Sequence, residues 1–206
     1  MKYKKLTVSL CFGLIFAIIF SVARFDASCE DVRQNILRLH IVANSDSAKD
    51  QEIKIKVRDA LLNDSKDVFN NTVNLNDAVK KAENSIEKFK KTACKTLKEN
   101  GFDYGVEISV GEADFNTREY NKFTLPAGKY KAVRVVLGNG KGKNWWCVMF
   151  PSLCVSTAEE HNLRESVNEN SAKICESKSD YKIRFKIVEI YEGIKAKISQ
   201  DTVYKK

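Results

Sequence analysis

Three side chains near the start of the chain are of the types that support nucleophilic catalysis: His40, Ser45 and Asp46. A serine hydrolase needs a serine nucleophile, a histidine base and an acidic residue that orients the histidine. The residues around Ser45 lack the Gly-x-Ser-x-Gly turn that exposes the nucleophile in the α/β-hydrolases. An exported cell-wall hydrolase that uses His40 and Asp46 is therefore kept only as an alternative hypothesis.

Other catalytic patterns are missing from the sequence. His40 and His161 are its only histidines, and neither belongs to a His-Glu-x-x-His pair or to a Cys/His group with zinc-ligand spacing. Glycines alternate at 138, 140 and 142, but no Gly-Lys-Ser/Thr ending or helix follows them as in a phosphate-binding loop. We expect a protein that binds rather than catalyses, with no cofactor, no metal and no small-molecule substrate.

The chain is basic, with a net charge of +8, but its lysines are spread along the sequence instead of clustered. A nucleic-acid-binding protein would show a basic stripe with interleaved aromatic residues or a known module, and the sequence shows neither. We therefore expect no nucleic-acid partner. Contact with an anionic membrane surface is a better use of the positive charge.

Residues 1–27 predict an export segment. Basic residues precede an almost wholly apolar run, Leu6–Phe20, and Ser21-Val22-Ala23 places small residues where signal peptidase cleaves. An uncleaved membrane anchor is the alternative, because residues 6–23 nearly reach the roughly 20 residues that span a bilayer. In both cases the residues after this segment lie outside the cytoplasm.

The most unusual stretch is residues 139–154, with the sequence N-G-K-G-K-N-W-W-C-V-M-F-P-S-L-C. Its six apolar residues, Trp145–Phe150, are the best candidate for a core strand. Alternation along that strand places Trp145, Cys147 and Met149 on one face and the other three residues, Phe150 among them, on the opposite face. Both faces are apolar, so we expect both to be covered.

Export makes disulfide bonds permissible. We expect Cys147 to pair with Cys154, because a turn at Pro151-Ser152 can bring the two cysteines together; two buried thiols are the alternative. An odd number of cysteines follows the export segment, so bridges within the chain cannot include all of them. The pairing of Cys29, Cys94 and Cys175 stays open.

The remaining patterns predict an α+β fold, in which a mainly antiparallel sheet packs against two amphipathic helices after the signal or anchor segment. Alternating residues predict strands, and apolar residues at three- and four-residue spacing predict helices. The predicted strands are residues 36–43, 106–110, 129–137 and 145–150, and the predicted helices are residues 50–62 and 77–100. Residues 138–143 are predicted to join the last two strands as a hairpin.

Three regions follow from these patterns. Residues 1–27 are a signal peptide or N-terminal membrane anchor, and residues 28–155 form the exterior α+β core domain. Residues 156–206 are a C-terminal extension with a weak helix over 157–176 and a final strand over 181–190.

Several segments resemble stage II sporulation protein R, in the same order and with the same spacing over roughly residues 36–154. The closest similarity lies around Asn144-Trp145-Trp146-Cys147, although Pro151 is followed by serine where the family has a second proline. The tail past Val155 matches only loosely. The segments that carry the resemblance are Leu37–Ser47, Asp50-Gln51, Lys54–Asp59, Phe123–Tyr130, Gly140–Pro151 and Leu153-Cys154.

This resemblance implies a signalling role. Proteins of this family are made in the forespore of endospore-forming bacteria and exported into the space between forespore and mother cell. There they trigger a membrane-embedded aspartic protease of the mother cell, which removes the pro-sequence of the early mother-cell sigma factor. A structural envelope domain without a signalling role is a further alternative.

For partner binding we expect one tryptophan to stay partly exposed as an anchor, flanked by Lys141, Lys143 and Asn144. Loop residues after the first strand are the other candidates. The complete set of candidate partner-binding residues is His40, Asn44, Asp46, Lys141, Lys143, Asn144, Trp145 and Trp146.

Overall fold

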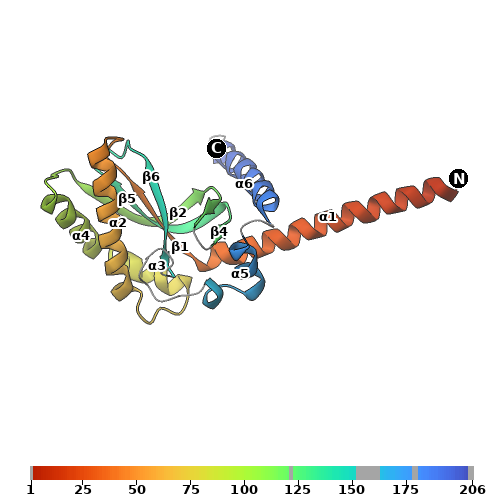
Figure 1. The fold of residues 1–206 in the computed structure, drawn as a ribbon, viewed down its shortest axis with the longest axis horizontal. Helices are drawn as coiled ribbons and strands as arrows, with labels where there is room; N and C mark the ends of the chain where they lie inside the picture. Colours follow the sequence, from red (N-terminus) through yellow and green to blue (C-terminus); the bar gives the residue numbers. More distant parts are fainter. Residues whose placement is uncertain (1, 121–122, 152–162, 178–180, 204–206) are drawn as a thin grey trace. The chain divides into compact units, whose positions relative to one another are not determined.

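The computed structural model describes residues 2–120, 123–151, 163–177 and 181–203 (Figure 1). Contacts divide the chain into two compact units. Unit 1 consists of residues 1–32, 116–128 and 168–206, and unit 2 consists of residues 33–115 and 129–167. The boundaries predicted after residues 27 and 155 stay predictions.

Unit 2 is built around a four-stranded sheet in the order β2-β5-β1-β6. The central strand β1 runs parallel to β5 and antiparallel to β6. The predicted α+β class is therefore confirmed, with a mixed sheet in place of a mainly antiparallel one. The strands are β1 (Leu37–Val42), β2 (Val106–Phe115), β5 (Gly128–Leu137) and β6 (Asn144–Phe150).

The predicted hairpin between β5 and β6 is wrong, because β1 lies between these two strands. All six residues of β1 are buried, so a central place satisfies both its edges and its faces. Residues 138–143 instead cross the end of β1. In this crossing, the backbone N–H groups of Lys141 and Gly142 donate to the carbonyl oxygens of Asn44 (3.2 Å) and Ala43 (2.9 Å).

Helices pack on one face of this sheet (Figure 1). The predicted helix over 77–100 is two helices, because the chain bends at Ser85, whose N–H bonds to the carbonyl of Ala82 (3.1 Å). The first helix begins at a side-chain cap, in which Ser47 accepts from the backbone N–H of Asp50. The helices of unit 2 are α2 (Ala48–Val68), α3 (Leu75–Asn84), α4 (Ile86–Glu99) and the 3₁₀ helix η1 (Leu163–Glu165).

The core of unit 2 lies between the helices and the sheet. It joins alternate residues of β1 to the apolar stripes of α2 and α4. Its fully buried members include Leu37, Leu39, Ile41, Val57, Leu61, Phe89 and Leu97.

Unit 1 contains the long N-terminal helix α1 (Lys2–Asn35) up to residue 32. From Lys5 onward, α1 is long and apolar enough to cross a membrane, and its apolar side chains from Leu6 to Phe20 are exposed. Such a helix indicates a signal sequence or an anchor. The other elements of unit 1 are β3 (Arg118–Glu119), β4 (Thr124–Leu125), α5 (Glu169–Glu176) and α6 (Lys182–Val203).

The strand predicted over 181–190 is wrong, because these residues form the start of α6. Ile183, Phe185 and Ile187 alternate, but the isoleucines at 183, 187, 190 and 194 also have helical spacing, and the longer pattern decides the structure. Of the predicted weak helix over 157–176, residues 169–176 are helical in α5. Residues 152–162 lie outside the described part of the chain.

The packing of α2 predicts a strong effect at Val57. Val57 is 0% exposed and Val73 is 86% exposed, so the same substitution tests burial alone. We expect Val57→Ala to lower the free energy of unfolding by about 2–3 kcal/mol, from about 0.8 kcal/mol for each lost carbon plus a cavity. Val73→Ala should change it by less than about 0.5 kcal/mol. Urea unfolding followed by tryptophan fluorescence measures both, and equal effects would contradict this core.

Candidate functional site

A polar junction lies where β1 ends, formed by residues 44–50 and by the crossing loop, residues 138–144. Asn44 connects the two segments. Its Oδ1 accepts from the backbone N–H of Asn139 (2.9 Å), and its Nδ2 donates to the carboxylate of Asp50 (2.9 Å). One amide side chain therefore fixes the loop to the first turn of α2.

Asp50 is the central acceptor of this polar junction. Besides Asn44, the Ser45 hydroxyl (2.5 Å) and the Tyr104 hydroxyl (3.1 Å) donate to its carboxylate, which is only 6% exposed as a residue. Burial alone would raise the pKa of Asp50, but the hydrogen bonds that it receives outweigh burial and hold the pKa below its ordinary value of 3.8. Asp50 is therefore a fixed, buried negative charge at neutral pH.

Tyr104 keeps its proton in this arrangement. Burial raises the pKa of its phenol, and the hydrogen bond to Asp50 and the charge of Asp50 raise it further. Tyr104 is thus a permanent donor to the carboxylate rather than an acid or a base.

The backbone of Lys143 is held from both sides. Its N–H donates to Oδ1 of Asp46 (2.7 Å), and its carbonyl accepts from Nζ of Lys54 (2.9 Å). Lys54 is only 3% exposed and also donates to Oε1 of Gln51 (2.6 Å). Burial lowers the pKa of Lys54, the charge of Asp46 partly offsets this, and the charge of Lys143 lowers it further. The start of α2 thus fixes the backbone that leads into β6.

Two glycines are required for this close approach. A Cβ at Gly142 would collide with the backbone carbonyl of Ser45, and a Cβ at Gly138 would collide with the side chain of Asn44. Gly138 also has a φ of +55°, in the left-handed region that favours glycine. The alternating glycines therefore let the loop pass over the end of β1.

On the sheet face opposite the helical core, β1 and β6 carry a layer of aromatic and basic side chains. His40 and Trp146 are register partners whose rings stack with centroids 3.8 Å apart, and the Nε2–H of His40 donates to Oδ1 of Asn144 (2.8 Å). The ring of Phe115 meets Trp146 edge-on at 4.8 Å. Burial lowers the pKa of His40. The hydrogen bond to Asn144 raises that pKa in part, and the charge of Arg134 lowers it further.

Arg38 completes this layer although it is 0% exposed. Its Nε donates to the carbonyl of Cys147 (3.1 Å), and its guanidinium lies 4.3 Å from the ring centroid of Phe115 and 5.0 Å from that of Tyr130. These contacts between cation and ring faces offset part of the cost of burying the charge. Strand β1, predicted from alternating residues, is therefore buried on both faces.

The candidate partner-binding residues fall into three groups by exposure. The exposed residues of the polar junction are Asp46, Lys141, Lys143 and Asn144. His40 is only 8% exposed, because the ring of Trp146 stacks on it. Asn44, Trp145 and Trp146 are partly buried. Their role in binding stays a prediction.

The two tryptophans lie on opposite faces of β6, as strand alternation predicts. Trp145 borders the helical core and contacts the guanidinium of Arg58 at 4.7 Å, while Trp146 packs on His40. Phe150 departs from the alternation, since it packs against the helical core and lies 5.9 Å from the ring of Phe69. A register shift between β1 and β6 at Leu37/Arg38 explains this change of face.

Cys147 is buried and disulfide-bonded. The expected partner, Cys154, lies outside the described residues, so this pairing stays a prediction. Cys29 and Cys175 are buried in unit 1, and burial raises the pKa of the Cys175 thiol, with Cys29 contributing to the same direction.

His40 and Asp46, the pair required by the hydrolase alternative, have different partners. Nε2 of His40 bonds to Asn144, and Asp46 accepts from the backbone of Lys143. Within the described ranges, no group of three or more histidine, cysteine, aspartate or glutamate residues could hold a metal ion. The arrangement can therefore present a fixed polar surface, and the described contacts assemble no acid–base pair.

Sequence reasoning missed Asp50, Lys54 and Tyr104. The available signal was weak: Ser47-x-x-Asp50 is a helix-capping pattern, and Lys54 lies one position from Ile53 on the buried stripe of α2. Nothing local in the sequence connects Tyr104 with Asp50.

These features define a class of protein: an α+β domain that follows an apolar N-terminal helix in the sequence and carries a hydrogen-bonded polar junction next to a tryptophan-rich strand. The family model for Stage II sporulation protein R matches residues 33–160. The chain therefore belongs to the Stage II sporulation protein R family, and the resemblance seen in the sequence is confirmed. This family supports a role in sporulation.

One curated relative is Stage II sporulation protein R of Bacillus subtilis (strain 168). It is 29% identical over 188 residues, which cover 87% of this chain and 83% of the relative. No solved structure matches this chain. The range matched by the family model contains β1, β6 and the whole polar junction.

The buried carboxylate predicts a pH-dependent effect of Asp50→Asn. We expect this variant to lose about 2–3 kcal/mol of stability at pH 7, comparable to one or two charge-assisted hydrogen bonds. Because the folded pKa lies below 3.8, the contribution is complete above that pH and is lost as pH falls through the folded pKa. Urea unfolding at pH 7 and pH 3 should show the gap between wild type and variant shrinking. The exposed Asp103→Asn serves as control, and a pH-independent gap would contradict the proposed charge.

The glycine geometry predicts opposite outcomes for two alanine substitutions. Gly142→Ala should lower the free energy of unfolding by about 1–3 kcal/mol, because its methyl group meets the backbone of Ser45. Gly111→Ala has nothing within 4 Å of the new Cβ and should be neutral or slightly stabilising. Thermal unfolding of the two variants makes the comparison, and a neutral Gly142→Ala would mean that the loop does not cross β1 closely.

Proposed function

We propose that this chain is an exported sporulation signal whose exterior part activates a membrane-embedded aspartic protease of the mother cell. Activation would lead to processing of the early mother-cell pro-sigma factor. The observation that carries the proposal is the family match over residues 33–160, which contains the polar junction and β6. The apolar helix α1 supports export to the space between forespore and mother cell, either as a signal or as an anchor.

The polar junction is suited to binding because its exposed groups stand on a fixed backbone. Lys141, Lys143 and Asn144 are exposed, and the loop that carries them is held by Asn44 and Asp46. Groups that are already ordered lose little conformational entropy when a partner binds. The partly exposed tryptophans beside them supply the aromatic area that is typical of an interface anchor.

Activation by binding sets a requirement on affinity. A ligand shifts an equilibrium only by the difference between its affinities for the two states. Taking a protease from 1% to 99% active would require a preference of about 5.5 kcal/mol. The domain must therefore contact a part of the protease that differs between its inactive and active states.

Reversing the two exposed charges on the loop tests this proposal. We expect Lys141→Glu/Lys143→Glu to reduce processing of the pro-sigma factor at least tenfold, about 1.4 kcal/mol of lost interaction. The folded state should remain intact, since both side chains are exposed. The assay mixes the exported protein with protease-bearing membranes and follows processing on a gel.

Lys90→Glu/Lys91→Glu on α4, which reverses the charges of two other exposed lysines, is the matched control. Equal processing by both double variants would remove the polar junction from the interface. Stable, stoichiometric binding without any processing by the wild type would favour the structural envelope domain instead.

A further inference from the structure

Helix α6 has two apolar sides, of which one is covered. Phe185 and Val188 are 4% and 2% exposed and belong to a small core with Phe25 and Cys29 of α1. On the other side, five isoleucines are 44–78% exposed: Ile183, Ile187, Ile190, Ile194 and Ile198. Isolated exposed apolar residues are common, but a continuous row of five along one helix marks an interaction surface. We call this row the isoleucine stripe.

The isoleucine stripe is narrow and continuous. At 100° per residue, its five side chains fall within about 80° of arc, somewhat narrower than the roughly 100° apolar stripe of a typical amphipathic helix. The buried Phe185 and Val188 fall outside this arc. The side of α6 that packs on α1 therefore does not include the isoleucine stripe, which stays exposed.

Cations border the isoleucine stripe on both sides. Arg184 and Lys195 fall beyond one edge and Lys186 and Lys197 beyond the other, all within about 60° of it. The acidic Glu189 and Glu192 fall toward the buried side, where they pair with Lys186 (2.7 Å) and Lys195 (3.7 Å). The charge that borders the isoleucine stripe directly is therefore positive.

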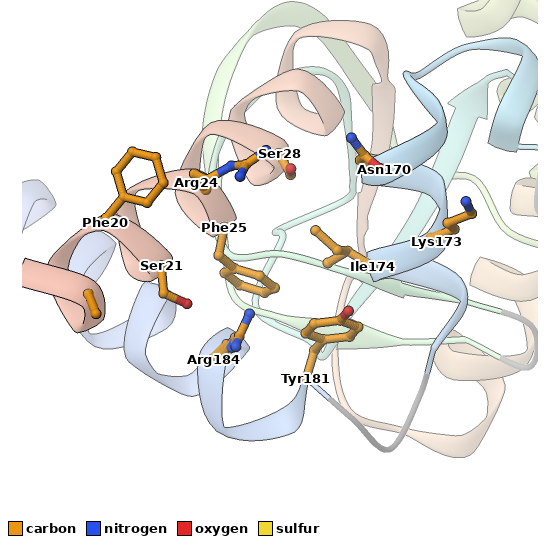
Figure 2. Close-up of a pocket in the computed structure, with 11 residues that line it drawn as sticks. Phe20, Ser21, Arg24, Phe25, Ser28, Asn170, Lys173, Ile174, Tyr181 and Arg184 are labelled. Atoms are coloured by element: carbon orange, nitrogen blue, oxygen red, sulfur yellow. The ribbon is translucent and has the colours of Figure 1, made fainter. Parts of the chain in front are cut away.

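The first turn of α6 lies beside the end of the apolar segment of α1. The Phe25 ring lies 5.8 Å from Tyr181 and 5.2 Å from Phe185, measured between ring centroids. Phe25 follows Ala23, the end of the predicted membrane segment, by two residues, or about 3 Å of helix rise. Figure 2 shows Phe25, Tyr181 and Arg184 close together, in a pocket of about 430 Å³ that Arg24 and Lys173 also line.

We propose that α6 is an interfacial helix that binds an anionic lipid surface. The isoleucine stripe enters the boundary between headgroups and acyl chains, and the four flanking cations meet lipid phosphates while their aliphatic stems cover the edges of the stripe. α1 marks where that surface lies, because its apolar segment ends next to the start of α6. The inference does not depend on activation of a protease.

The charges favour lipid over a second copy of the chain. Helices that pair through an apolar stripe usually carry opposite charges at its two edges, so that partners attract each other. Here both edges are basic, and two stripes facing each other would bring cations together. An anionic membrane supplies the complementary charge along both edges of the isoleucine stripe.

The test uses the full chain reconstituted in vesicles of phosphatidylcholine with 30% phosphatidylglycerol, or of phosphatidylcholine alone. Amide hydrogen exchange is followed by mass spectrometry over residues 183–198. We expect at least tenfold slower exchange in the anionic vesicles, and the difference should disappear in 0.5 M NaCl. Equal exchange in both vesicles would overturn the proposal.

Two variants separate the contribution of the isoleucines from that of the flanking lysines. Ile187→Gln/Ile190→Gln/Ile194→Gln keeps residues of good helix propensity and should lose the protection by anionic lipid. Lys186→Gln/Lys197→Gln should weaken it, whereas the matched control Lys91→Gln/Lys95→Gln on α4 should not. Unchanged exchange in phosphatidylcholine shows that each variant is folded.

Retention of the protection by the isoleucine variant would overturn the proposal. So would protection that depends on the protein-to-lipid ratio and occurs without phosphatidylglycerol, because a second copy would then cover the isoleucine stripe.

Discussion

The structure of unit 2 depends on one constraint: β1 is buried on both faces and paired on both edges, so the loop that crosses its end and the start of α2 must be fixed there by hydrogen bonds. Asp50 and Asn44 meet this constraint together. The carboxylate collects three side-chain donors, and Asn44 bonds both to Asp50 and to the crossing loop. Removing the Asp50 carboxylate would leave three donors of this partly buried junction unpaired, which is more costly than losing one exposed hydrogen bond.

The same constraint explains why a small domain can present an ordered binding surface on a glycine-rich loop. Glycine normally makes loops flexible, but here Gly138 and Gly142 allow an approach so close that the loop backbone is hydrogen-bonded to the end of β1 and to the start of α2. The exposed lysines of that loop stand on a backbone that is hydrogen-bonded to residues at the end of β1 and at the start of α2. The glycine-rich loop is therefore held in place by its hydrogen bonds in the folded protein.

Local patterns were enough to predict most elements. The strand at residues 36–43 and the first amphipathic helix carry clear periodicity, the tryptophan-rich strand is a continuous apolar run, and their resemblance to a known family located the candidate site. Strand order could not be predicted, because inserting β1 between β5 and β6 depends on contacts between residues about one hundred positions apart, such as His40 with Asn144. Asp50 and Lys54 were missed because charged residues near a helix start are usually solvated. The start of α6 was mistaken for a strand because a five-residue window fits both periods.

One feature of the connectivity has a mechanical meaning. Only Ile36 separates the last residue of α1 from the first residue of β1 along the chain. If α1 stays in a membrane, tension on that tether passes directly into β1. A strand that is bonded on both edges resists a pull along its axis by loading many hydrogen bonds at once, instead of opening them one after another. If α1 is an anchor, the strand that follows it is thus the part of unit 2 best built to bear force.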